Sequence, residues 1–294
     1  MNSNFFRRFD VRPLVVLALA LMFGLLTACA PSAMALWERN VKRGWTKDFQ
    51  PVDLPAPPFR LAGLLKGKSG DELVVYIEGD GRAVVAGRPS QDPTPLFAQS
   101  LELAFLDDAP LVLYLARVGQ YMPSFANKSY QPYWSSARLA PEVVQAASSA
   151  IDEVKRKTGA QRIHLVGFSG GGGLAVLLAD SRSDVVSLVT IAGLLDTDWW
   201  VKSQGWHPLT GSLNPASRAE NLVDIPQIHY YGYKDKIIVP EMSQRFAGLA
   251  SFQNFKRVGL ELDHYHGWTK IWSTLLDTQI MPLRQSASAT SDEL

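Results

Sequence analysis

The chain has 294 residues, of which 47% are hydrophobic, 10% aromatic and 19% charged, and its formal net charge is +1. This composition is typical of a globular domain with a large core, and it excludes a disordered or fibrous protein. Basic residues are scattered singly or in pairs rather than gathered in a stripe, so we do not expect the protein to bind nucleic acid.

Residues 1–28 have the pattern of an export signal. Three arginines precede an apolar run at 13–26, which is shorter than the roughly 20 residues that a membrane-spanning helix needs. The exit, "LTAC", resembles the lipobox of bacterial lipoproteins, in which the cysteine is acylated and becomes the new N-terminus. Cys29 is the only cysteine, so an internal disulfide is excluded and lipidation explains its presence. An ordinary cleaved signal or an uncleaved anchor helix is the alternative.

Lipidation of Cys29 predicts a protein held on a membrane of the bacterial cell envelope. Ala30 gives no aspartate retention signal, which favours the periplasmic side of the outer membrane over the inner membrane in a Gram-negative host. Residues 29–58 hold several prolines and little hydrophobic periodicity, which predicts an extended tether. Residues 285–294 are small and polar, which predicts a disordered tail.

Between tether and tail, over residues 59–284, apolar runs alternate with helical patterns. The runs are nearly continuous, as is typical of parallel strands that are covered on both faces. This alternation predicts an α/β fold, a three-layer sandwich with a central, mainly parallel sheet and helices on both faces. The expected strands are 72–78, 111–116, 162–167, 186–193, 228–232 and 257–262, and the expected helices are 140–159, 172–181, 240–251 and 268–280.

One serine stands among glycines between an expected buried strand and an expected helix. The stretch from Gly167 to Gly171 matches Gly-x-Ser-x-Gly, the strand-to-helix turn that exposes a nucleophilic serine. Glycines allow unusual backbone conformations there and a close approach of strand and helix. We therefore expect Ser169 to be a nucleophile. A phosphate-binding turn would use the same glycines, but the chain lacks Gly-x-x-x-x-Gly-Lys, so nucleotide binding is the weaker hypothesis.

A serine nucleophile needs a base that takes its proton and a carboxylate that orients the base. Asp235 comes just after the expected strand 228–232 and is the expected acid. An aspartate that only shapes a turn is the alternative reading, and Asp196 and Asp198 are the fallback acids.

The base is expected just after the last strand, because the end of a parallel strand delivers its loop over the nucleophile. Two histidines stand there, His264 and His266. Their His-x-His spacing also suits a metal, but no third ligand cluster stands nearby in the sequence, so we expect no metal site.

From about residue 60 to residue 283 the chain resembles the α/β-hydrolases, with "GFSGG", "YKDKIIVP" and "LDHYHGW" in that family's order. The motifs "YIEGDG", "YLARVGQY", "YWSSAR" and "GSLNP" resemble a little-described branch of bacterial lipoprotein-type α/β-hydrolases. In the family a small or acidic residue stands before the histidine, so the resemblance favours His264, which follows Asp263. His266 precedes Gly267 and is the alternative base, or a residue that contacts substrate.

The resemblance also implies an oxyanion hole and no cofactor. One donor is the backbone N–H after the nucleophile, here Gly170, and the second comes from the loop after an early strand, here "EGDG". Glu78 stands where many relatives have histidine. Asp80 is the expected second donor, with Gly81 as the alternative.

Two segments, residues 82–100 and 197–222, are expected to shape the substrate site, and the second lies where hydrolases often carry a lid. Three tryptophans of that segment either line an apolar pocket or pack the flap: Trp199, Trp200 and Trp206.

Together these features predict a lipid-anchored serine hydrolase that cleaves an ester, thioester or amide of a small-molecule or lipid-like substrate. A non-catalytic binding or scaffolding module on the same fold is the alternative.

Overall fold

The computed structural model describes residues 31–122 and 129–291. The chain divides into two compact units, Met1–Ser32 and Ala33–Leu294, and the elements below belong to the second. The predicted signal peptide and Cys29 lie outside the described residues. Within the described ranges, no helix combines the length and the apolar character that crossing a bilayer requires.

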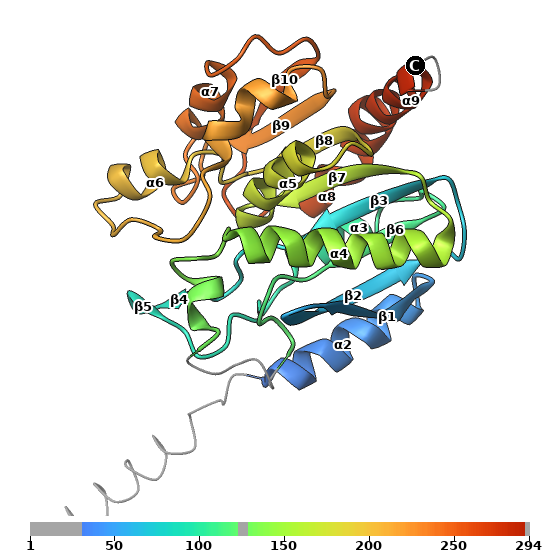
Figure 1. The fold of residues 1–294 in the computed structure, drawn as a ribbon, viewed down its shortest axis with the longest axis horizontal. Coiled ribbons are helices and arrows are strands. Elements are labelled where there is room, and N and C mark those ends of the chain that lie inside the picture. The colour runs from blue at the N-terminus through green and yellow to red at the C-terminus, as the bar shows by residue number, and fades with distance from the viewer. Residues whose placement is uncertain (1–30, 123–128, 292–294) are drawn as a thin grey trace, which may run out of the picture. The chain divides into compact units, whose positions relative to one another are not determined.

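The centre of the second unit is an eight-stranded sheet with the order β1-β2-β6-β3-β7-β8-β9-β10 (Figure 1). The six strands from β6 to β10 in this order run parallel, whereas β2 pairs antiparallel with β6 and β1 antiparallel with β2. The mainly parallel sheet confirms the predicted fold class. The strands are β1 (Phe49–Ala56), β2 (Phe59–Lys66), β3 (Glu72–Ile77), β6 (Val112–Leu115), β7 (Arg162–Phe168), β8 (Val185–Ile191), β9 (Gln227–Gly232) and β10 (Phe255–Leu260), with a separate hairpin of β4 (Val84–Val85) and β5 (Arg88–Pro89).

Helices cover both faces of the sheet, and each face has its own apolar core (Figure 1). Along β3, Leu73 and Val75 pack into one core, and Val74 and Tyr76 into the other, because successive side chains of a strand point to opposite faces. Helices α4, α5 and α7 supply the first core, and α2, α3 and α8 the second. The helices are α2 (Ala33–Trp45), α3 (Gln99–Ala104), α4 (Pro141–Thr158), α5 (Gly170–Ser181), α6 (Thr197–Ser203), α7 (Glu241–Ala247), α8 (Trp268–Leu275) and α9 (Met281–Ser291).

The prediction of an extended tether at 29–58 is wrong for its described part, because α2 and β1 form there. Leu36 in α2 and Phe49 in β1 are each 1% exposed, so both elements pack onto the sheet. The prolines of β1 are tolerated because this strand lies at the edge of the sheet and pairs only with β2, where a missing N–H costs little.

The prediction of a disordered tail at 285–294 is also wrong as far as the chain is described. Helix α9 runs to Ser291. Its Arg284 forms a buried ion pair with Asp107, at 2.8 Å between Nη2 and Oδ2, which holds the helix on the domain. Arg284 immediately precedes this segment, and Ala287 within it is also buried, so the small and polar composition did not reveal that the helix packs against the domain.

Candidate active site

Ser169 occupies the turn between β7 and α5, as the glycine pattern predicts. Its backbone is strained, with φ 53° and ψ −122°, a conformation that non-glycine residues seldom adopt. The turn is also too crowded for side chains, since a Cβ on Gly167 would lie 2.3 Å from the carbonyl oxygen of Gly171. The sequence therefore excludes side chains around the turn and holds the serine hydroxyl at its tip.

The structure brings together the three side chains that the sequence singles out as nucleophile, base and acid. His264 Nε2 lies 3.0 Å from Ser169 Oγ, and His264 Nδ1 lies 2.7 Å from Asp235 Oδ2. All three side chains are largely buried. They follow the carboxyl ends of β7, β9 and β10, which lie at the same edge of a parallel sheet.

The orientation of Asp235 is fixed by the backbone. Its Oδ1 accepts hydrogen bonds from the N–H groups of Ile237 and Ile238, at 2.8 and 2.9 Å, which leaves Oδ2 for the histidine. A carboxylate held in this way selects the tautomer of His264 that carries its proton on Nδ1 and presents a lone pair on Nε2 to the serine.

His266 and the fallback acids lie outside the hydrogen-bonded chain of Ser169, His264 and Asp235, although His266 lines a pocket that adjoins the one over Ser169, so its alternative role as a substrate contact stays open. The side chain of His266 is 85% exposed, and its Nδ1 lies 3.0 Å from the carboxylate of Asp263. Asp196 is the N-cap of α6 and accepts a hydrogen bond from the N–H of Trp199. Asp198 binds the side chain of Asn214. The geometry therefore favours His264 over His266 and Asp235 over the other aspartates.

The loop after β3 lies directly against the nucleophile turn. A Cβ on Gly170 would lie 2.0 Å from Asp80 Oδ1, and a Cβ on Gly79 would lie 3.3 Å from the Cβ of Ser169. Within the described residues, the backbone N–H groups of Gly170, Asp80 and Gly81 donate to no other group. The predicted oxyanion donors are thus beside Ser169 and available to a ligand.

Glu78 stabilises the same loop through hydrogen bonds to its backbone. It is buried, and its Oε1 accepts hydrogen bonds from the N–H groups of Gly79 and Ser100, at 2.9 and 3.4 Å. Burial raises the pKa of this carboxyl group to about 7, although the backbone hydrogen bonds act in the opposite direction. Glu78, which stands where many relatives have histidine, is therefore a buried side chain whose carboxyl group positions the loop.

Two arginines that sequence reasoning missed hold the side chain of Asp80. Arg138 Nη1 lies 2.6 Å from Oδ2, and Arg117 Nη1 lies 3.2 Å from Oδ1. Burial opposes ionisation of Asp80, but the two guanidinium groups outweigh it and keep its pKa below the ordinary value. The motifs "YLARVGQY" and "YWSSAR" contain these arginines, but their partner is distant in the sequence.

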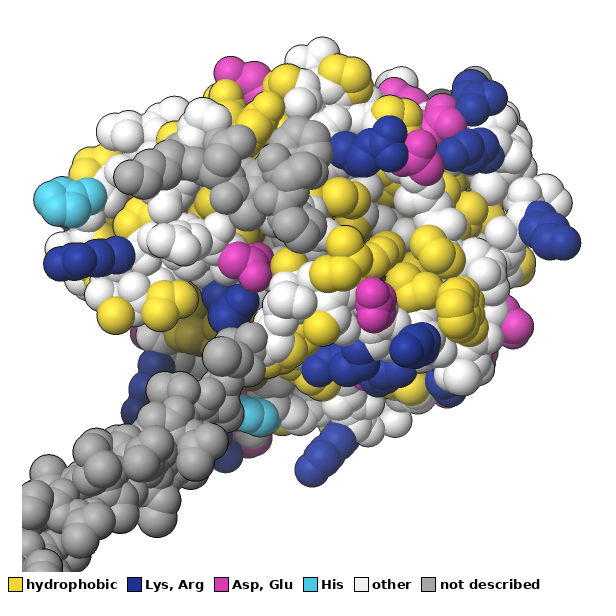
Figure 2. Space-filling view, turned by 90° about the horizontal axis from the view of Figure 1, so that it is seen from below, with side chains coloured by type: hydrophobic (Ala, Val, Ile, Leu, Met, Phe, Trp, Pro, Cys, Tyr) yellow, Lys and Arg dark blue, Asp and Glu magenta, His cyan; other side chains and the backbone are white. Residues whose placement is uncertain are grey.

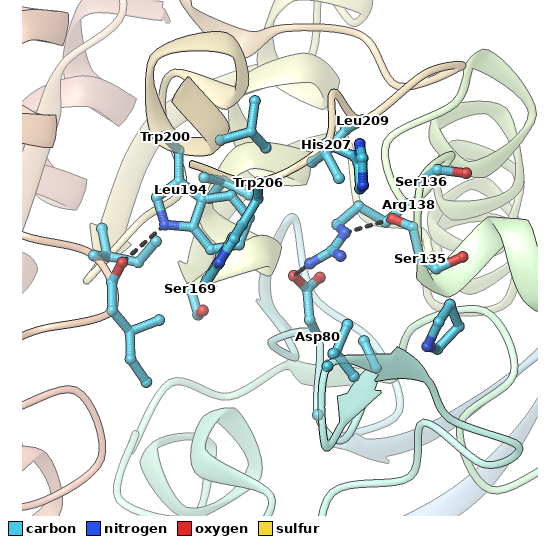
Figure 3. A pocket seen from close by; sticks show the side chains of 18 of the residues that line it. Asp80, Ser135, Ser136, Arg138, Ser169, Leu194, Trp200, Trp206, His207 and Leu209 are labelled. Atoms are coloured by element: carbon cyan, nitrogen blue, oxygen red, sulfur yellow. Dashed lines mark hydrogen bonds and ion pairs between the residues drawn. The ribbon is translucent and has the colours of Figure 1, made fainter. Parts of the chain in front are cut away.

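A pocket of about 660 Å³ lies over Ser169 (Figure 3). In Figure 3, Leu194, Trp200 and Trp206 group on one side of it, and Asp80 and Arg138 lie on the other. Both inserted segments contribute: the first supplies the hairpin β4–β5, and the second supplies α6 and the loop after it. The segment 197–222 ends in a 3-10 helix, Pro215–Leu222.

The tryptophans divide between the two roles that the sequence left open. Trp200 and Trp206 line the pocket and pack edge to face, with ring centroids 4.8 Å apart. The indole N–H of Trp200 donates to the carbonyl oxygen of Ile237 at 2.8 Å. Trp199 does not line this pocket, and the guanidinium of Arg245 lies over its ring.

A second pocket, of about 550 Å³, adjoins the first. Three residues, Gly81, Phe168 and Tyr265, line both pockets and form the boundary between them. Leu96 and Phe97 contribute apolar surface to the second pocket. A substrate held at Ser169 thus has two adjoining spaces in which its parts can lie.

No protein-family model matches the chain, and no curated protein matches it by sequence. Solved structures do match it in fold. Est1E from Butyrivibrio proteoclasticus matches at 10% identity and a TM-score of 0.58, covering 80% of this chain and 99% of that one. The Pyrococcus furiosus esterase Pf2001 matches at 13% identity and a TM-score of 0.55, with coverages of 80% and 94%.

The acylaminoacyl peptidase of Pyrococcus horikoshii matches at 12% identity and a TM-score of 0.58. That match covers 78% of this chain but 41% of the peptidase, so the chain spans about two fifths of the peptidase's length. All three are α/β-hydrolase structures. The chain therefore has the α/β-hydrolase fold, and at these identities the likeness concerns the fold alone.

Proposed function

We propose that the protein is a serine hydrolase that cleaves an ester, thioester or amide, with Ser169 as nucleophile, His264 as base and Asp235 as the orienting acid. The observation that supports this most is the hydrogen-bonded chain from Ser169 through His264 to Asp235, built on a strained turn. A serine that only packs in the core would need neither the strain nor the two partners.

In the first half of the reaction, Ser169 Oγ attacks the carbonyl carbon of the substrate while His264 Nε2 takes the hydroxyl proton. The negative charge that develops on the carbonyl oxygen is stabilised by the N–H groups of Gly170 and Asp80, with Gly81 as the alternative second donor. His264 then gives its proton to the leaving group as the bond to the carbonyl carbon breaks, and an acyl-enzyme forms.

In the second half, water takes the place of the serine hydroxyl. His264 removes a proton from the water, whose oxygen attacks the acyl carbon, and the bond to Ser169 Oγ breaks as the proton returns to the serine. Asp235 stabilises the imidazolium form of His264 in both halves and stays ionised itself. This reaction needs no cofactor.

A non-catalytic binding module is the alternative function, and labelling with a fluorophosphonate probe tests between them. We expect the purified protein to be labelled, because an activated serine attacks the phosphorus of the probe, displaces fluoride and forms a phosphonate ester. The matched control is Ser135→Ala, which removes a different hydroxyl group of the same pocket and should leave labelling intact. Ser169→Ala should abolish it. A folded wild-type protein that is not labelled, or a Ser169→Ala variant that is, contradicts the proposal.

We also propose that the protein is anchored in the bacterial cell envelope through acyl chains on Cys29, on the periplasmic side of the outer membrane in a Gram-negative host. Its substrate would be a small-molecule or lipid-like ester rather than a nucleic acid. The lipobox and the single cysteine support the anchor. Helix α2 starts at Ala33, four residues after Cys29, and four extended residues reach about 14 Å at most.

The surface around α2 suits a position close to a membrane. Met34 and Trp45 are 48% and 54% exposed, and Lys42 is exposed between them. Figure 2 shows the side of the molecule that lies at the bottom of Figure 1, where apolar side chains are interspersed with Lys and Arg and with some Asp and Glu. Mass spectrometry of the mature N-terminus tests the anchor: we expect an acylated peptide that begins at Cys29, and an unmodified peptide that begins elsewhere contradicts it.

A further inference from the structure

Arg138 presents an unused hydrogen-bond donor to the pocket that contains Ser169. Its Nη1 donates to Asp80 at 2.6 Å, and its Nε donates to the carbonyl oxygen of Ser135 at 2.7 Å. The third nitrogen, Nη2, has no acceptor within the described parts of the chain, although the residue is only 6% exposed and lines the pocket. A guanidinium group that is nine-tenths buried with one nitrogen unpaired leaves a favourable interaction for a ligand to complete.

The cluster around Arg138 also carries surplus positive charge. Arg117 and Arg138 share the single carboxylate of Asp80, so the three side chains sum to +1 when all are ionised. The buried Glu78 also acts on Arg117, and because the pKa of Glu78 is raised to about 7, it offsets this charge only above that pH. Arg117 donates through Nη2 to the carbonyl oxygen of Arg138, and its buried Nε has no hydrogen-bond partner among the residues that the structure describes. While Glu78 is protonated the positive charge has no further counter-ion, so an anionic group of a ligand would be stabilised here.

The rest of the pocket sets the other half of the ligand's chemistry. The apolar part of the lining includes Leu194, Trp200 and Trp206 (Figure 3). The guanidinium of Arg138 lies over the ring of Trp200, with Cζ 5.7 Å from the ring centroid, so the cationic and apolar parts meet at this contact. Beside Arg138, the pocket is lined by Ser136, whose hydroxyl group makes no hydrogen bond within the described residues. The pocket is therefore divided into an apolar side and a cationic, hydrogen-bonding side, with Ser169 in contact with the same space.

We propose that Arg138 binds a carboxylate group of the substrate, and that the preferred substrates combine this carboxylate with an apolar segment next to the scissile carbonyl. This inference rests on the proposed hydrolase function. Arg138 Nη2 supplies the direct hydrogen bond, and the surplus charge of the cluster supplies the electrostatic attraction. The competing account is that Arg138 only braces Asp80 and so positions the oxyanion loop, which would affect charged and neutral substrates equally.

Two p-nitrophenyl esters that differ in charge and by one methyl group separate these accounts. We would measure kcat/KM for the mono-p-nitrophenyl ester of adipic acid, which is an anion, and for its neutral methyl ester. In the wild-type protein we expect the anion to be preferred by at least about tenfold, as one charge-assisted hydrogen bond allows. Arg138→Gln should bring the ratio to within about twofold of one.

Arg117→Lys is the matched control, because it disturbs the other arginine that holds Asp80, keeps the charge and lies outside the pocket lining. It should change kcat/KM for both esters by a similar factor and leave their ratio close to the wild-type value. A wild-type ratio of one or less overturns the proposal. An Arg138→Gln variant that loses activity on both esters equally also overturns it, because that result assigns Arg138 a bracing role only.

A binding measurement separates failure of this inference from failure of the hydrolase proposal. In the Ser169→Ala background, we would titrate the anion monomethyl adipate and follow tryptophan fluorescence, since Trp200 and Trp206 line the pocket. We expect Kd to rise at least about tenfold when Arg138→Gln is added. An unchanged Kd, with circular dichroism showing both variants folded, overturns the carboxylate site whether or not the wild-type protein hydrolyses either ester.

Discussion

Replacing Asp235 by Asn tests the proposed mechanism at the residue whose surroundings are defined most fully. Oδ1 accepts two hydrogen bonds from backbone N–H groups, and Oδ2 faces His264 Nδ1 at 2.7 Å. An asparagine must keep its carbonyl oxygen on the two backbone donors, so its NH₂ group turns toward the histidine. His264 then accepts at Nδ1 and carries its proton on Nε2, where it can no longer take the proton of Ser169.

We expect kcat to fall about 10⁴-fold, which corresponds to roughly 5.5 kcal/mol of transition-state stabilisation, because the wrong tautomer of the base is selected. The fold should remain, since volume and both backbone hydrogen bonds are retained. The assay is p-nitrophenyl ester hydrolysis at pH 8, with circular dichroism on the same samples.

Asp196→Asn is the matched control, because this aspartate follows a neighbouring strand but serves as the N-cap of α6. Asparagine caps helices about as well as aspartate, so activity should stay within about threefold of the wild type. The reasoning is refuted if Asp235→Asn keeps a tenth of the wild-type kcat, or if Asp196→Asn loses as much activity as Asp235→Asn.

Other contacts of the site and the core can be tested in the same way. His264→Ala should lower kcat about a thousandfold or more, whereas His266→Ala, an exposed residue, should keep at least a tenth of it; the reverse order in steady-state kinetics would refute the assignment. Arg284→Met should lower the free energy of unfolding by about 3–5 kcal/mol at pH 7, measured by urea denaturation, because it leaves the buried Asp107 carboxylate unpaired. Burial opposes the ionisation of Asp107, but Arg284 outweighs it and keeps the folded-state pKa of Asp107 below its ordinary value. In the wild type, the stability that the ion pair contributes is therefore complete above the unfolded-state pKa of Asp107 and is lost as the pH falls through the folded-state pKa. Burial raises the pKa of Glu78 to about 7, so its ionisation destabilises the folded state. As the pH rises from 5 to 9, the free energy of unfolding of Glu78→Gln should therefore increase by about 3 kcal/mol relative to that of the wild type. Parallel pH profiles of the two unfolding free energies would contradict this.

The fold class and the strand-to-helix turn that carries Ser169 could both be predicted from the sequence. Apolar runs bounded by turns predict strands such as β3 and β7 because buried parallel strands carry apolar side chains on both faces. The glycines around Ser169 predict the turn because the required approach of strand and helix excludes larger side chains. Both signals are local, so they can be recognised without a partner elsewhere in the chain. The catalytic role of Ser169 stays a prediction.

Features that depend on partners far apart in the chain became visible only in the folded structure. From the sequence alone, the prolines of β1 predict an extended tether. The structure places β1 at the edge of the sheet, where prolines are tolerated. His264 and His266 share one short loop, and only the packing of that loop turns the first toward Ser169 and leaves the second in solvent. The cluster of Asp80, Arg117 and Arg138 joins three separate segments, and each residue alone resembles an ordinary surface charge. Ion pairs of this kind form through space, so neither residue spacing nor periodicity in the sequence predicts them.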